Sequence, residues 1–328
     1  MHVELLVPAL RAGRAFTQRL PALELLIARA RTRGGESTTL EGRLLEAYGA
    51  DADRMPAGAL TLAAQGGEPG EALWLRADPV HLLQQRELLM VMPAPAVHVT
   101  QDEADALAGT LNRHFGGELE IHTAHPERWC AKVAAPASLD ALVPMQAAGR
   151  HLEAVLPGGD AKRWHALLNE AQMLLHDHPV NAAREARGER AVNSLWLWGL
   201  GAMPENLRRL WQTVSADDSV ARGLGIASGA RVDALPADAA ALLARLPADG
   251  RHMVVLDAMR NADALDDDAA WAAEIAALES RWIAPLLQAL RADRIGMITL
   301  HVPDADESQS HELVRGDLRR FWRRPRPL

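Results

Sequence analysis

Short apolar runs alternate with helical segments along this chain, and this alternation most constrains its fold. Strands are predicted at Val3–Val7, Leu195–Trp198, Met253–Leu256 and Gly296–Leu300, because each run is short and apolar. The segment Trp271–Leu290 instead repeats its apolar residues at helical spacing. Apolar strands separated by helices indicate a mainly parallel sheet that helices cover on both faces. The pattern therefore predicts an α/β fold.

The middle of the chain has a different pattern. Thr100 and Glu103 have the spacing of a capping box, which predicts a helix running to about Phe115. Strands are predicted at Leu119–His122 and at Trp129–Val133. A strand, a helix and further strands in so short a block indicate a compact α+β unit.

Length and composition bound the domain organisation. The chain has 328 residues, of which 48% are apolar, so it is long enough for one large domain with an insertion or for two domains. We predict a core domain from 1–92 and 161–328, with an inserted α+β domain at 93–160. Cys130 is the single cysteine, so no intrachain disulfide can form and a reducing cytoplasm is favoured.

Charge and hydropathy argue against two classes of partner. The formal net charge is -8, which does not favour a general nucleic-acid binder. No stretch approaches the roughly 18 apolar residues of a membrane span. The chain ends in an arginine-rich segment with Phe321 and Trp322, read either as a solvated or ion-paired tail or as a surface for a protein partner. Its arginines are Arg315, Arg319, Arg320, Arg323, Arg324 and Arg326.

One tract is more specific than core packing requires. It begins His178-Pro179-Val180-Asn181, continues through Arg184 and Gly188, and ends in the predicted strand and Gly-Leu-Gly at 199–201. The third glycine of a dinucleotide-binding fingerprint is absent, so no dinucleotide site is predicted.

This tract resembles the corresponding segment of archaeal-type cofactor-independent phosphoglycerate mutases, a family of the alkaline phosphatase superfamily. Weaker matches follow in the same order at 20–30, 35–49, 58–78, 222–224 and 261–279. The resemblance covers nearly the whole chain and implies an alkaline phosphatase-like sheet, mostly parallel and flanked by helices. It resembles a degenerate bacterial branch of this family, similar to RpfE-type regulatory proteins.

The resemblance implies two metals and a nucleophilic serine. Asp263, Asp267 and His311 match one metal site, with Asp267 in the place of a histidine. Aspartate oxygens suit manganese or magnesium, so one such divalent metal is conceivable there. The alternative is that the aspartates form a solvated, acidic helix start, which the helix dipole favours.

The second metal site is less complete. His301 matches its histidine, whereas Ala9 and Leu300 stand where the family has carboxylates. A conventional two-metal centre is therefore not expected.

The nucleophile and the substrate side are also matched. Ser37 or Thr38 falls at the family's serine, although a Ser/Thr run can equally cap a helix. Four further residues match positions on the substrate side of the family's site. Arginine suits phosphate because its planar guanidinium can donate two hydrogen bonds to the phosphate oxygens at once. These residues are Arg76, His178, Asn181 and Arg184. His178 and Asn181 could instead cap their segment and bond neighbouring backbone.

Three functions follow. The leading hypothesis is a degenerate, non-catalytic phosphoglycerate mutase-like protein that binds a phosphorylated small molecule or acts in regulation. The first alternative is a metal-dependent phosphoglycerate mutase or phosphatase with rearranged ligands. The second is an interaction scaffold that uses the arginine-rich C-terminus.

Overall fold

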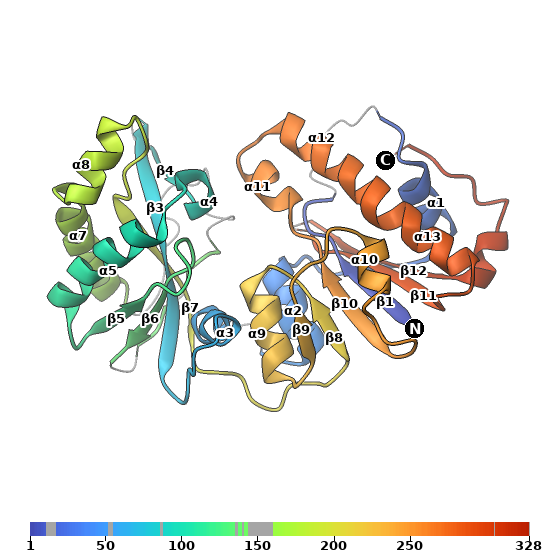
Figure 1. Cartoon of the computed structure of the whole chain (residues 1–328), viewed down its shortest axis with the longest axis horizontal. Helices are drawn as coiled ribbons and strands as arrows, with labels where there is room; N and C mark the ends of the chain where they lie inside the picture. Colours follow the sequence, from blue (N-terminus) through green and yellow to red (C-terminus); the bar gives the residue numbers. More distant parts are fainter. Residues whose placement is uncertain are drawn as a thin grey trace. The chain divides into compact units, whose positions relative to one another are not determined.

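The structure is a computed structural model, and it describes residues 1–10, 18–51, 55–85, 88–134, 137–139, 141–143, 160–304 and 306–327. The chain divides into two compact units (Figure 1). Unit 1 comprises Met1–Ala52 and Asn206–Leu328, and unit 2 comprises Asp53–Glu205. Each unit has its own sheet and its own apolar core.

Unit 1 contains a seven-stranded sheet in the order β2-β12-β11-β1-β10-β8-β9. The strands are β1 (His2–Leu6), β2 (Arg31–Gly35), β8 (Thr213–Ser215), β9 (Arg231–Asp233), β10 (Arg251–Val255), β11 (Met297–Val302) and β12 (Ser308–Val314). From β11 to β9 all pairings are parallel, whereas β12 and β2 extend the sheet in antiparallel fashion. The predicted α/β class with a mostly parallel sheet is confirmed.

Helices cover both faces of this sheet. They are α1 (Pro21–Arg29), α2 (Leu40–Tyr48), α9 (Ser219–Ala227), α10 (Ala239–Leu243), α11 (Met259–Ala264), α12 (Asp268–Ala277) and α13 (Ala284–Arg291), with a π-helical turn η2 (Leu278–Ile283) and a 3-10 turn η3 (Arg315–Arg319). The predicted long helix is α12, η2 and α13 in direct succession (Figure 1).

The alternation of side chains sorts the sheet of unit 1 into an apolar and a polar face. Leu5 and Leu300 lie in the core beneath α1, α12, η2 and α13. Glu4 and His301 are the next residues along their strands, so they face the opposite side. Gly225 of α9 lies against Val214 on that second side, so α9 packs over the polar face at β8.

A contact between distant parts of the sequence starts α1. Leu20 at its N-cap makes no side-chain capping bond, although Pro21 opens the helix. The carboxylate of Glu279 accepts hydrogen bonds from the backbone N–H groups of Ala22 (2.7 Å) and Leu23 (2.8 Å). These are among the amides that a helix start leaves unpaired, so η2 completes α1 across the chain.

Unit 2 contains an antiparallel sheet in the order β4-β3-β6-β5, with β7 also paired to β3. The strands are β3 (Leu73–Gln85), β4 (Leu88–Met92), β5 (Leu119–His122), β6 (Cys130–Val133) and β7 (Ser194–Gly201). The helices described are α3 (Ala57–Ala64), α4 (Ala94–Val97), α5 (Gln101–Phe115), α7 (Ala161–His176) and α8 (Pro179–Ala186). The predicted capping box is present, since Thr100 and Glu103 bond each other's backbone N–H groups.

The strand predicted at Leu195–Trp198 exists, but it belongs to unit 2. It pairs with β3 rather than with the parallel strands of unit 1. Helices α3 and α7 contact it, which makes it a continuous buried run like that of a parallel strand. Periodicity alone cannot distinguish those two environments. Unit 2 is accordingly wider than the segment 93–160 proposed as the insertion. Within that segment, 135–136, 140 and 144–159 lie outside the described residues.

Candidate functional site

His178 serves as the cap of α8. Its Nδ1 accepts a hydrogen bond from the backbone N–H of Val180 at 3.2 Å, and its Nε2 contacts the Thr110 hydroxyl at 3.0 Å. Burial, followed by the charge of Arg113, lowers the pKa of this imidazole. A neutral ring is what the capping bond requires, because the Nδ1 must keep its lone pair.

Asn181 joins the end of α7 to the segment that precedes β7. Its side-chain amide donates to the carbonyls of Leu175 (2.7 Å) and Val192 (2.8 Å). Its side-chain oxygen accepts from the Val192 N–H at 2.8 Å. With three bonds to buried backbone, this amide is committed to structure.

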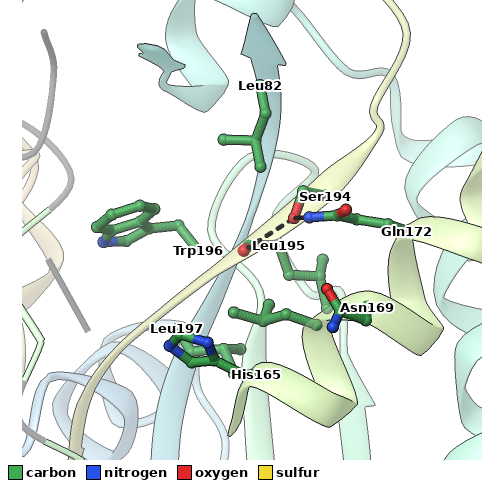
Figure 2. Close-up of a pocket in the computed structure, with 9 residues that line it drawn as sticks. Leu82, His165, Asn169, Gln172, Ser194, Leu195, Trp196 and Leu197 are labelled. Carbon is green, nitrogen blue, oxygen red and sulfur yellow. Dashed lines mark hydrogen bonds between the residues drawn. The ribbon is translucent and has the colours of Figure 1, made fainter. Parts of the chain in front are cut away.

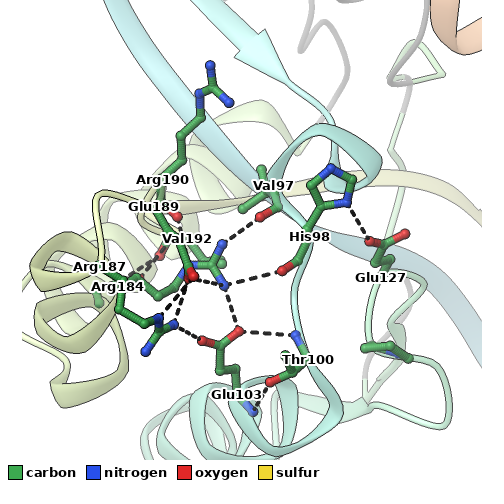
Figure 3. A network of polar contacts seen from close by, with 12 residues as sticks. Val97, His98, Thr100, Glu103, Glu127, Arg184, Arg187, Glu189, Arg190 and Val192 are labelled. Atoms are coloured by element: carbon green, nitrogen blue, oxygen red, sulfur yellow. Dashed lines mark hydrogen bonds and ion pairs between the residues drawn. The ribbon is translucent and has the colours of Figure 1, made fainter.

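Arg184 lies at the centre of a polar network in unit 2 (Figure 3). Its guanidinium donates to the carbonyls of Val97 (2.5 Å) and Arg190 (2.7 Å) and pairs with Glu103 at 2.6 Å. Its side chain is only 1% exposed. Glu103 belongs to the capping box of α5, and Val97 ends α4. Arg184 therefore connects the start of α5, the end of α4 and the loop before β7.

Arg76 forms a buried ion pair inside unit 2. It donates to Asp78 at 2.6 and 2.9 Å and lies 5.2 Å from the centre of the Trp198 ring. Trp198 Nε1 also donates to Asp78 at 2.8 Å. Together with the three residues above, Arg76 therefore has a packing role, and the alternative that His178 and Asn181 cap their segment matches the observed bonds.

The glycines of the same tract have a steric explanation. Gly199 has a φ of +67°, and a Cβ placed there would lie 2.4 Å from the Cβ of Ala57. At Gly201 the corresponding atom would lie 2.8 Å from Pro56. Because these two positions carry no Cβ, the start of α3 can pack directly against β7.

Ser37 and Thr38 lie in unit 1 on a turn between β2 and α2. Thr39 is the residue that caps α2, accepting from the Gly42 N–H at 3.1 Å. The Thr38 N–H donates to the Asp304 carbonyl at 2.9 Å, which fixes the turn beside the end of β11. Ser37 is exposed and makes no side-chain bond with the described residues.

A cavity of about 560 Å³, here called the arginine pocket, surrounds this turn. Arg33, Ser310 and His301 occupy paired positions on β2, β12 and β11, so their side chains share one face of the sheet. The other lining residues are Arg31, Gly34, Gly35, Glu36, Ser37, Thr38, Gly42, Arg43, Glu46, Thr299, Val302, Pro303, Ser308, Gln309 and Glu312.

The arginines of this pocket differ in how they are engaged. Arg43 pairs with Glu46 at 2.7 Å and approaches His301 at 3.4 Å, and Arg31 lies 3.8 Å from Asp317. Arg33 is exposed and makes no hydrogen bond or ion pair in the described part of the chain. Its guanidinium is therefore available to an anion. Sequence reasoning missed Arg31, Arg33 and Arg43, although the alternation of arginines before the Ser/Thr run was a usable signal.

A buried carboxylate adjoins the pocket. Glu4 is 3% exposed, accepts from Arg251 at 2.7 Å, and lies 3.5 Å from His301 Nε2 and 3.4 Å from His2. Burial acts to raise its pKa, but the hydrogen bonds from His301 and Arg251 outweigh burial and lower the pKa to about 2. His301 Nδ1 contacts the Ser310 hydroxyl at 2.8 Å, so this histidine links Glu4 to the pocket wall.

The proposed ligands of the first metal are not brought together. Asp267 caps α12 by accepting from the Ala270 N–H at 2.9 Å. His311 is 1% exposed, bonds Thr32 at 2.9 Å, and pairs with Leu300, which places it on the apolar face of the sheet. Within the described residues, no group of three or more His, Cys, Asp or Glu side chains is placed to hold a metal ion.

The second metal site lacks its donors. Ala9 adopts a φ of +60°, and its carbonyl accepts from the Trp271 indole at 2.9 Å. Ala9 and Leu300 present methyl and isobutyl groups, which cannot ligate a cation. The residues present thus do not fit the two-metal centre that the resemblance implies.

A smaller cavity lies in unit 2 between α7 and β7 (Figure 2). Its volume is about 40 Å³, and Gln172 donates to the Ser194 hydroxyl at its wall at 3.3 Å. Water, rather than a metabolite, fits this volume.

Comparisons with known proteins find curated relatives of one kind. The chain is 31% identical over 144 residues to a 2,3-bisphosphoglycerate-independent phosphoglycerate mutase of Methanosarcina barkeri, covering 41% of this chain and 36% of that protein. It is 28% identical over 187 residues to a probable enzyme of the same name from Geobacter sulfurreducens, covering 52% and 45%. The chain thus spans less than half the length of these relatives.

A solved structure from Pyrococcus horikoshii shares the fold, with a TM-score of 0.56 and 14% identity over 95% of this chain and 87% of that one. No family model matches the sequence. Of the helices described, none has both the length and the apolar character needed to cross a membrane.

Replacing Arg184 tests whether its hydrogen bonds and ion pair stabilise the fold of unit 2. We expect Arg184→Met to lower the free energy of unfolding by about 3 kcal/mol, because it removes the donor of the Val97 and Arg190 carbonyls and one of the two guanidinium partners of Glu103. Urea unfolding measures the change. The control is Arg187→Met, since Arg187 is 48% exposed and pairs with the same Glu103; equal losses in the two variants would refute the assignment.

Glu4 gives a pH dependence of defined sign. Its folded pKa of about 2 lies below the ordinary value of 4.5, so its stabilising contribution is complete above pH 4.5 and is lost as the pH falls towards 2. Glu4→Gln should cost about 3 kcal/mol at pH 7 and less at pH 3. Unfolding free energies at several pH values test this, with the exposed Glu36→Gln as control. An unchanged pH profile in Glu4→Gln would show that Glu4 is not the group responsible.

Proposed function

Since the chain is a homologue of 2,3-bisphosphoglycerate-independent phosphoglycerate mutases, we propose that it is a degenerate relative that binds a phosphorylated small molecule and does not turn it over. The arginine pocket of unit 1 is the proposed binding site. A protein that binds such a metabolite without consuming it is suited to regulation.

The observation that carries the proposal is the position of Arg33. Its guanidinium is unpaired in the described residues and faces the same side of the sheet as Ser310 and His301, next to the hydroxyls of Ser37 and Thr38. A guanidinium with nearby hydroxyl donors can bind phosphate oxygens through charge-assisted hydrogen bonds. The volume of about 560 Å³ lies within the usual range for small-molecule sites.

The surroundings of the proposed nucleophiles, and the contacts of the proposed metal ligands, support binding without turnover. A serine or threonine hydroxyl needs a neighbouring base or a metal to become nucleophilic. Asp267 is engaged in capping and His311 faces the opposite side of the sheet, so neither is placed to activate Ser37 or Thr38. His301 lines the pocket, and its two nitrogens contact Ser310 and Glu4.

Ligand binding at the arginine pocket can be measured directly. We expect 3-phosphoglycerate to raise the melting temperature of the full chain and Arg33→Ala to weaken its affinity about tenfold or more, because one charged hydrogen-bond donor is lost. Isothermal titration calorimetry gives the dissociation constants. Arg231→Ala is the matched control, since Arg231 is an exposed arginine on β9 that pairs with Asp233 outside the pocket.

The same preparation distinguishes the enzymatic alternative. Conversion of 3-phosphoglycerate to 2-phosphoglycerate with manganese supplied, abolished by Asp263→Ala or His311→Ala, would support a metal-dependent mutase instead. Phosphate release under these conditions would support a phosphatase. An equal affinity in the wild type and in Arg33→Ala would place the ligand elsewhere.

A second candidate function uses the C-terminal segment. Arg320 and Arg323 donate to the carbonyls of Arg29 (3.1 Å) and Ala30 (2.8 Å), which holds the segment at the end of α1. Phe321 and Trp322 are 77% and 66% exposed, and their rings meet edge to face with centroids 5.3 Å apart. Exposed aromatic residues beside arginines are typical of protein interaction hot spots.

The double variant Phe321→Ala/Trp322→Ala tests this candidate. We expect it to fold as the wild type does and to lose a partner that the wild type retains in a pull-down, because it removes most of the exposed aromatic area. Met173→Ala is the control, since Met173 is 75% exposed on α7. Retention of the same partner by the double variant would argue against an interface at this segment.

A further inference from the structure

A second large cavity in unit 1, here called the loop pocket, has a volume of about 440 Å³. Its lining comes from the segments that follow β8, β9 and β10 and from one side of α12 and η2. These three strands are parallel, so their carboxyl ends meet at one edge of the sheet. The crevice outside the carboxyl ends of parallel strands is where α/β proteins commonly bind ligands.

The floor of the loop pocket is apolar. It is formed by Leu256, Met259, Leu278 and Trp282, which are 7%, 3%, 5% and 6% exposed. All four belong to the core on the apolar face of the sheet. A floor of this kind favours a ligand with an apolar body, because the body would leave water on binding.

Two ionic side chains of opposite sign face the loop pocket from the helix. Glu274 and Arg281 are seven residues apart, which is about 10 Å along a helix axis. Neither makes a hydrogen bond or an ion pair with the described residues, each other included. Arg281 lies in the π-helical turn η2, a type of irregularity that is frequent at functional sites.

The opposite wall adds two carboxylates. Asp217 follows β8 and accepts from the Leu235 N–H at 3.2 Å, and Asp257 follows β10. The lining thus carries three carboxylates, Glu274 included, and a single guanidinium. Asp217 and Asp257 have partners within the protein, so Glu274 is the carboxylate that can bind a cationic group of a ligand, while Arg281 can bind an anionic one.

We propose that the loop pocket is a binding site for an apolar α-amino acid, whose side chain lies on the Trp282 floor. The ammonium group is directed to Glu274, and the carboxylate is directed to Arg281. The pocket shares no residue with the arginine pocket. It lies on the apolar face of the sheet, whereas His301 and Ser310 face the other side, so the two sites can be occupied together.

The test uses the full chain and free L-leucine, L-methionine, L-phenylalanine and L-tryptophan. We expect at least one of them to bind with a measurable dissociation constant in calorimetry and to raise the melting temperature. Arg281→Gln and Glu274→Gln should each weaken that binding about tenfold. The corresponding decarboxylated amine should lose affinity in Glu274→Gln but not in Arg281→Gln, because it lacks the group that Arg281 binds.

Two control variants make the result specific. Arg291→Gln removes an exposed arginine of α13 that does not line the loop pocket, and it should leave the dissociation constant unchanged. Arg33→Ala should also leave it unchanged, which separates this inference from the proposed function of the arginine pocket. Failure of all four amino acids to bind would overturn the proposal, as would binding that neither Arg281→Gln nor Glu274→Gln weakens by more than twofold.

Discussion

The alternation of side chains across β1, β11, β12 and β2 is the constraint on which the arginine pocket of unit 1 depends. Along β11, Leu300 enters the apolar core while the next residue, His301, faces Glu4 and Ser310. One side of the sheet therefore buries apolar area, and the other keeps an ionic network together. Because a strand has a period of two residues, a slip of one position would exchange these roles and bury charge in the core.

Unit 2 shows what a specific sequence motif can mean physically. The tract from His178 to Gly201 is its most distinctive segment, yet the side chains of His178 and Asn181 bond to nearby backbone. The side chain of Arg184 pairs with Glu103 and donates to backbone carbonyls (Figure 3). Such residues tolerate little change, because each replacement leaves buried polar groups without partners. The motif can therefore persist as a requirement of the fold while the chemistry of unit 1 diverges.

Local patterns predicted local structure well. The Thr100–Glu103 capping box, the strands at Val3, Met253 and Gly296, and the long helix from Trp271 are each signalled by a residue pattern within one short segment. The π-helical turn was not predicted, because it adjusts the helix to partners such as the start of α1. The strand at Leu195 was predicted as a strand but not as part of unit 2, since burial on both faces leaves the same apolar signature in either kind of sheet.

The sequence by itself determined the α/β class, the kinship with phosphoglycerate mutases, and the absence of carboxylates at Ala9 and Leu300, because these depend on residue identity and local periodicity. Only the tertiary structure decided which polar groups are already engaged. Arg76 and Arg184 carry the same guanidinium as Arg33, but Asp78 and Glu103 pair with the first two, while Arg33 is left open on an edge strand. Whether a guanidinium is available to a ligand depends on whether the fold places a carboxylate beside it. The packing of the whole unit decides which segments come together.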